Sequence, residues 1–243
     1  MTQNWIKNTK KEILDKIEEL PDNFSGFKSD LLAREDMIGD VLVHELVDLS
    51  WSDHFGFAKF LVSSEMVGDK YFAEYISRRN GKCQCLRGVV LLKVNGKITH
   101  FVIRKCQRFG LEQEVYESLG NIYQTNKEFS ENKFSLSEYI KDETTKIMHI
   151  DNINVDRFFD LGNVYTDVSM FNNIVRIFAM TIEVKDVKDI SNYTDNKLFN
   201  KTLYSYKIEI IPIEKFYEFF VQVSDSVLLA IFGRLQALNV IKL

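Results

Sequence analysis

The sequence predicts an α+β fold: an α/β/α sandwich around one mixed β-sheet, preceded by a helical segment at the N-terminus. Apolar residues recur at helical spacing from about residue 3 to residue 51. Alternating, aromatic-rich segments follow from residue 57 and return later in the chain. Two helical patterns close the sequence. Strands, then a helix, then strands, then helices is an order typical of an α+β sandwich.

Residues 1–56 are expected to form a helical extension. One amphipathic helix is predicted over residues 3–20, and Pro21 and Gly26 bound a turn after it. A second apolar-periodic stretch, residues 29–51, predicts another helix. We therefore expect the main domain to cover residues 57–243.

The clearest local signal in the main domain is a β-hairpin. Two apolar runs, residues 85–94 and 97–104, flank Asn95 and Gly96, a pair that suits a type I′ turn. The remaining expected elements are earlier strands at 58–62 and 70–78, a helix at 136–148, strands at 157–165, 174–184 and 207–213, a mobile loop at 185–202, and helices at 213–220 and 225–238.

Bulk composition narrows the classes of function. A net charge of -4 with mixed signs argues against general nucleic-acid binding, which needs concentrated positive charge. No apolar run approaches the ~20 residues of a membrane span, and the N-terminus lacks an apolar signal core. Cys83, Cys85 and Cys106 form no disulfide or zinc pattern, so reduced thiols and a cytoplasmic protein are expected.

Three segments, Glu114–Gly120, Ser137–Ile147 and Leu161–Asn173, occur in an order and at spacings that resemble the centre of a Nudix hydrolase. The resemblance is strongest to the ADP-ribose pyrophosphatase branch and extends over about residues 58–243. The family's box reads G-x5-E-x7-R-E-U-x-E-E-x-G-U, where U is aliphatic. Here the box is stretched after Gly120, and Glu128 or Glu131 would take the place of its isolated glutamate.

The resemblance implies a Mg²⁺ and catalytic site made of Glu138, Asp142 and Glu143, because oxygen ligands on one helix face suit this hard cation. Tyr139 stands where the family has a further glutamate, so the acid cluster is incomplete. Shifting the alignment by one residue places Glu138 at that position but brings Lys141 onto a later acid. The alternative is that these acids are only a solvated helix face.

The expected ligand-binding residues are Arg104, Arg108, Glu117, Gly120 and Tyr165. The two arginines would clamp phosphates, and the tyrosine would stack on a base or ribose ring. The competing explanation is structural, since cations after a strand are commonly solvated and tyrosines commonly belong to the core.

Two functions follow from this resemblance. The favoured one is a degenerate Nudix-fold protein that binds an ADP-ribose-like nucleoside diphosphate, or a protein partner, without efficient hydrolysis. The alternative is an active pyrophosphatase that needs Mg²⁺; the binding protein would need no cofactor. Loss of several carboxylates favours the first, because each contributes about 2–4 kcal/mol of transition-state stabilisation. The N-terminal region is a candidate surface for a homodimer or another protein.

Overall fold

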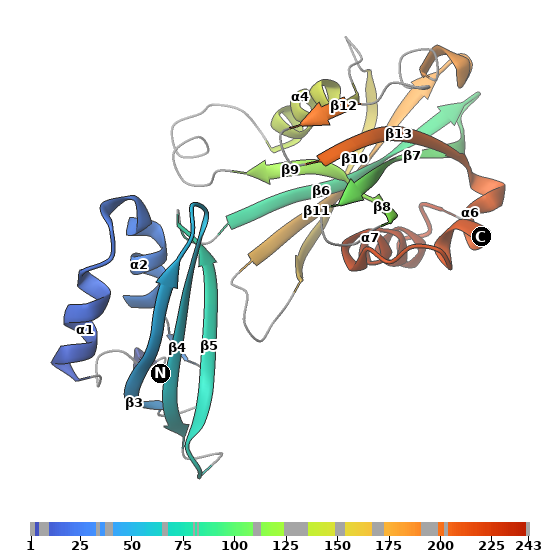
Figure 1. Cartoon of the computed structure of the whole chain (residues 1–243). Coiled ribbons are helices and arrows are strands. Elements are labelled where there is room, and N and C mark those ends of the chain that lie inside the picture. Colours follow the sequence, from blue (N-terminus) through green and yellow to red (C-terminus); the bar gives the residue numbers. More distant parts are fainter. Residues whose placement is uncertain are drawn as a thin grey trace. The chain divides into compact units, whose positions relative to one another are not determined.

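The computed structural model describes residues 3–4, 10–32, 35–36, 41–64, 68–79, 81, 83–108, 113–123, 136–148, 154–166, 173–190, 199–201 and 204–241. The chain divides into two compact units (Figure 1). Unit 1 comprises Met1–Gln84 with Tyr165–Ile174, and unit 2 comprises Cys85–Val164 with Val175–Leu243. Among the described helices, none is both long and apolar enough to cross a membrane.

Unit 1 is a three-stranded antiparallel sheet covered on one face by short helices (Figure 1). Its helices are α1 (Lys11–Glu18), η2 (Asp22–Phe24) and α2 (Ser25–Leu32). Its strands are β3 (Val41–Trp51), β4 (Phe55–Ser64) and β5 (Tyr71–Arg78), with a separate short pair of β1 (Gln3–Asn4) and β2 (Glu35–Asp36). Ile17, Phe27 and Phe60 are fully buried between the helices and the sheet.

The predicted helix over residues 29–51 is wrong, because α2 ends at Leu32 and residues 41–51 form β3. Two irregularities in the pairing of β3 with β4 explain the error. The first, between Val43 and Glu45, places Val43 and Leu46, three residues apart, on the same buried face. A bulged strand therefore has the apolar spacing of a helix.

The N-terminal helix is also shorter than predicted. It begins at Lys11, while residues 3–4 form β1 instead of the helix's first turn. β4 and β5, which were expected to open the main domain, pack in the sheet of unit 1. The N-terminal segment is thus a helix-covered sheet and not a purely helical extension.

Unit 2 is built on a sheet that has eight strands within the described residues, ordered β10-β11-β6-β7-β13-β12, with β8 beside β7 and β9 beside β6. The bounds are β6 (Cys83–Val94), β7 (Lys97–Arg108), β8 (Glu114–Glu117), β9 (Leu119–Tyr123), β10 (Val155–Tyr165), β11 (Asn173–Val184), β12 (Phe199–Lys201) and β13 (Tyr204–Pro212). The predicted hairpin is confirmed, since β6 pairs with β7 and Asn95 and Gly96 have positive φ angles of 51° and 75°.

Helices lie on both faces of this sheet (Figure 1). On one face, Ile140 and Met148 of α4 (Leu136–Met148) share a core with Val102. On the other face, the adjacent Phe101 contacts aromatic rings of the C-terminal helices, among them Phe232 at 5.1 Å between centroids. Those helices are η3 (Ile213–Lys215), α6 (Phe216–Phe220) and α7 (Ser226–Ala237). The predicted α/β/α sandwich is confirmed, because neighbouring residues of a strand point to opposite faces.

Candidate functional site

The acids predicted to bind a metal lie on α4, and the two whose side chains are described point away from the sheet. Ile140 and Thr144 are buried against the core, whereas Glu138 and Asp142 are exposed. Each acid is two residues from Ile140, which places it about 200° around the helix from that buried position. α4 therefore presents Glu138 and Asp142 on the side opposite its packed face.

These described acids do not fit a Mg²⁺ site. The carboxylate of Asp142 pairs with the Lys146 ammonium at 2.6 Å, with about 60% of each side chain exposed, as i,i+4 partners on a helix surface do. No three His, Cys, Asp or Glu side chains group together within the described part of the chain. Glu143 is in α4, but its side chain lies outside the described residues, as do Glu128 and Glu131.

Arg104 is buried and bonded within its own sheet. Its side chain is 3% exposed, and its Nη2 donates a hydrogen bond to Oε2 of Glu117 at 2.9 Å. Its Nη1 donates to the carbonyl oxygen of Gly120 at 3.2 Å. The pairing of β7 with β8 places Arg104 directly opposite Glu117. Arg104 shares its strand face with Val102 and Cys106, whose side chains belong to the core beneath α4.

A second arginine, Arg87 of β6, reaches the same backbone carbonyl. Its Nη1 donates to the oxygen of Gly120 at 3.4 Å. Burial lowers the pKa of Arg87, and the positive charge of Arg104 lowers it further. Glu117 and Asp225 act in the opposite direction. Two cations and two carboxylates thus balance one another around Gly120, which lowers the cost of enclosing these charges.

Asp225 links this cluster to the last helix. Its Oδ1 accepts a hydrogen bond from the backbone N–H of Val227 at 2.9 Å and so caps the N-terminus of α7. Its Oδ2 accepts from the backbone N–H of Ser118 at 3.3 Å. Sequence reasoning missed Arg87 and Asp225 as members of the cluster. The available signal was the charge of Arg87 among the apolar residues at the start of the run in β6.

Gly120 occupies a position that only glycine fits. Its φ angle is 140°, in a region that side-chain-bearing residues rarely adopt. A Cβ at this position would lie 2.0 Å from the carbonyl oxygen of Leu86. The glycine therefore lets β9 approach β6 closely.

The two remaining predicted ligand residues are not brought to this cluster by any described contact. Arg108 is the last residue of β7, opposite Tyr204, and its side chain lies outside the described residues. Tyr165 ends β10 with 57% of its surface exposed, in a segment that belongs to unit 1. Their roles in ligand binding stay predictions.

The described contacts of the cluster join β6, β7, β8, β9 and the start of α7. A role of these residues in ligand binding stays a prediction. Arg104 pairs with Glu117 and donates to Gly120, so a phosphate bound through its Nη atoms would compete with contacts that are already present. Both arginines of the cluster hold the carbonyl oxygen of Gly120, the residue at which the box-like segment begins. No catalytic step follows from the described side chains.

Comparison with known proteins supports the fold. The chain resembles the crystal structure of an ADP compounds hydrolase with a TM-score of 0.53 and 10% identity, over 85% of this chain and 100% of that one. A candidate Nudix hydrolase aligns with a TM-score of 0.38 and 14% identity, over 71% of this chain and 80% of that one. No family model matches the sequence. No curated protein matches it either.

The fold is thus Nudix-like, as the sequence predicted. At 10% identity the likeness concerns the arrangement of helices and strands and not the residues of the site.

Proposed function

We propose that this chain is a Nudix-fold binding protein for a nucleoside diphosphate of the ADP-ribose type and that it does not hydrolyse this ligand efficiently. The ligand class is supported by the fold shared with an ADP compounds hydrolase and by the sequence resemblance around Gly120 and α4. A homodimer or protein contact through the N-terminal region remains part of the proposal.

One observation supports the proposal that the chain does not hydrolyse its ligand efficiently. Glu138 and Asp142 face away from the packed side of α4, and Lys146 already neutralises Asp142. A diphosphate hydrolase needs several carboxylates that converge on its metal. Acids on a solvated helix face provide weak binding to a divalent cation and little transition-state stabilisation.

The test is ³¹P NMR of ADP-ribose mixed with the full chain, with and without Mg²⁺, followed over hours. We expect the diphosphate resonances to shift or broaden without new monophosphate resonances. Monophosphate resonances that appear with Mg²⁺ and vanish with EDTA would establish an active pyrophosphatase and overturn the proposal. An unchanged spectrum would remove ADP-ribose as the ligand.

The same experiment can test Arg108 as a phosphate ligand. We expect Arg108→Gln to weaken ADP-ribose binding by about tenfold or more, because a charge-assisted hydrogen bond contributes about 1.5–3 kcal/mol. Lys215→Gln removes an exposed cation on η3 and serves as the matched control for lost charge. Equal affinities in both variants would remove Arg108 from the ligand site.

For hydrolysis itself, the discriminating variant is the double change of Asp142 and Glu143 to Ala. If wild-type protein shows Mg²⁺-dependent cleavage and the double variant cleaves equally fast, the activity does not depend on the predicted metal ligands.

A further inference from the structure

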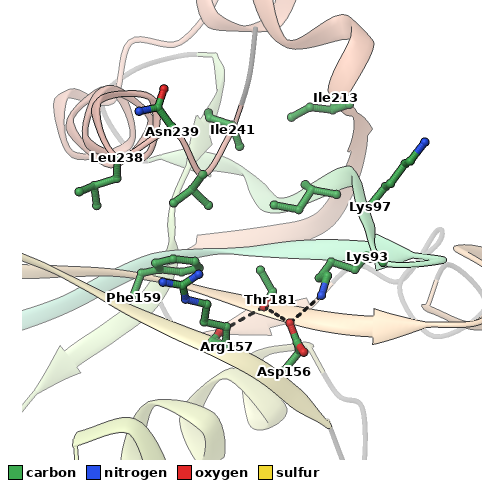
Figure 2. Close-up of a pocket in the computed structure, with 13 residues that line it drawn as sticks. Lys93, Lys97, Asp156, Arg157, Phe159, Thr181, Ile213, Leu238, Asn239 and Ile241 are labelled. Carbon is green, nitrogen blue, oxygen red and sulfur yellow. Dashed lines mark hydrogen bonds and ion pairs between the residues drawn. The ribbon is translucent and has the colours of Figure 1, made fainter.

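A pocket of about 890 Å³ opens on the face of the unit 2 sheet that lies opposite α4 (Figure 2). Its floor comes from β10, β11 and the β6–β7 hairpin, and its wall from η3 and the chain that follows α7. Thr181 lines it, whereas the flanking Met180 and Ile182 belong to the core beneath α4. Since a strand alternates its side chains, the pocket lies on the other face from the predicted nucleotide site.

The positive charge of this pocket is only partly neutralised. Lys93 pairs with Asp156 at 2.8 Å and with Glu183 at 3.5 Å. Arg157 instead lies over the ring of Phe159, with its guanidinium carbon 4.6 Å from the ring centroid (Figure 2). Within the described part of the chain, Arg157 makes no ion pair at salt-bridge distance. A guanidinium held flat on a ring keeps its N–H donors for another acceptor.

Apart from Asn239, the opposite wall of the pocket is apolar. Ile213, Leu238 and Ile241 face Phe159 across the cavity (Figure 2). Small-molecule sites commonly enclose about 300–1,000 Å³ and combine apolar walls with a few oriented polar groups. Here the polar groups at the floor are Arg157 and the satisfied trio of Lys93, Asp156 and Thr181.

Lys97 adds a third cation to the lining, in the strand that follows the hairpin turn. In Figure 2 its side chain extends outward from the pocket. A cation at this position attracts an anion toward the opening without fixing its orientation. The cavity thus combines a cationic floor and rim with an apolar wall in a chain whose net charge is -4.

We propose that this pocket binds a small organic anion that carries an aromatic ring. The ring packs between Phe159 and the apolar wall of Ile213, Leu238 and Ile241, and the anionic group accepts hydrogen bonds from Arg157. This site is separate from the proposed nucleotide site, because the two lie on opposite faces of the sheet.

The experiment is a fluorescence titration of the full chain with 8-anilinonaphthalene-1-sulfonate, an aromatic anion, and with N-phenyl-1-naphthylamine, its uncharged analogue. We expect the sulfonate to bind saturably at one site. Arg157→Gln should weaken its binding about tenfold, and loss of the exposed Lys97 charge in Lys97→Gln about twofold. The uncharged analogue should be almost insensitive to both changes.

A second variant keeps Arg157 in place. Leu238 is 59% exposed after the end of α7, so Leu238→Glu adds a carboxylate to the pocket wall without disturbing the core. It should weaken sulfonate binding by about tenfold or more through repulsion. Lys141→Gln, an exposed change on α4, is the matched control and should leave the affinity unchanged.

Wild-type affinity for the sulfonate in both Arg157→Gln and Leu238→Glu would overturn the proposal. Equal weakening of the charged and uncharged probes would also overturn it, because the pocket would then not recognise the anion. Displacement of the sulfonate by ADP-ribose would contradict two separate sites. ADP-ribose that fails to bind at all, with the sulfonate results as expected, would overturn only the proposed nucleotide function.

Discussion

Two ion pairs join consecutive residues of β7, Arg104 and Lys105, to acids of β8, and they differ in how far solvent reaches them. In the first, Arg104 and Glu117 are 3% and 12% exposed. In the second, Lys105 and Glu114 are 22% and 51% exposed. Water screens the second pair and stabilises either partner alone, whereas the first pair has little access to water. The two pairs therefore allow the effect of burial on the stability contribution of an ion pair to be measured within one strand pairing.

Neutralising Glu117 should destabilise the chain strongly. Glu117→Gln leaves the buried Arg104 charge without its carboxylate, and we expect the free energy of unfolding to fall by about 3–5 kcal/mol. Glu114→Gln, the matched control in the same short strand, should cost less than about 1 kcal/mol. Urea denaturation followed by circular dichroism measures both values. Losses of equal size would show that the Arg104–Glu117 pair is not a buried charge pair in solution.

For individual residues, the sequence predicts which of them belong to a polar cluster better than it predicts which of them contact one another. It identified Arg104, Glu117 and Gly120, and the structure places these three in direct contact. From the sequence, these residues were assigned to a ligand. Their bonds to one another could not be predicted, because they depend on the register of β7 with β8, which no local pattern reveals. Asp225 was missed because it reaches Ser118 across 107 positions of the chain.

Among the elements, those with strong local signals were predicted well. α4 was expected over residues 136–148 and covers Leu136–Met148. The hairpin of β6 and β7 was expected because Asn95 and Gly96 favour its turn. β3 was mistaken for a helix because its bulges come from pairing with β4, a non-local interaction. Elements are thus predictable here where their own residues determine their shape.

The contact between β9 and β6 depends on Gly120. Gly120→Ala should destabilise the chain by about 1–3 kcal/mol or more, because it combines a strained φ angle with a Cβ that meets the backbone of Leu86. Gly233→Ala is the contrasting control, since Gly233 is an exposed helix residue with nothing within 4 Å of an added Cβ. It should stabilise α7 by about 0.5–1 kcal/mol.

Thermal unfolding of the two glycine variants would measure these opposite effects. We expect a lower midpoint for Gly120→Ala and an equal or higher midpoint for Gly233→Ala. A midpoint for Gly120→Ala that equals the wild-type value would contradict the close approach of β9 to β6.

For the whole molecule, the main feature is that the described residues of each unit bury a hydrophobic core of their own. One core contains Ile17 and Phe60 of unit 1, and the other contains Val102 and Met180 of unit 2. Both tryptophans, Trp5 and Trp51, belong to unit 1. Tryptophan fluorescence therefore reports on unit 1, while far-ultraviolet circular dichroism reports on both units.

We predict that the two units unfold separately, because a core substitution acts on the unit that contains it. Phe232→Ala removes a buried ring in unit 2 and should cost about 3–5 kcal/mol. It should lower a dichroism midpoint and leave the fluorescence midpoint unchanged. Ile17→Ala should shift the fluorescence midpoint. Equal shifts of both signals in both variants would show a single cooperative unit.

The contact of Asp225 with Ser118 also determines when unit 2 can finish folding during synthesis on the ribosome. The charge cluster around Gly120 includes Asp225, and the edge of β7 is covered by β13, residues 204–212. A nascent chain that has reached only residue 200 contains both arginines of the cluster but lacks this carboxylate and this strand. The core of unit 2 should therefore be completed only after residues 204–225 have emerged. Until then its apolar strands are exposed to chaperones and to aggregation.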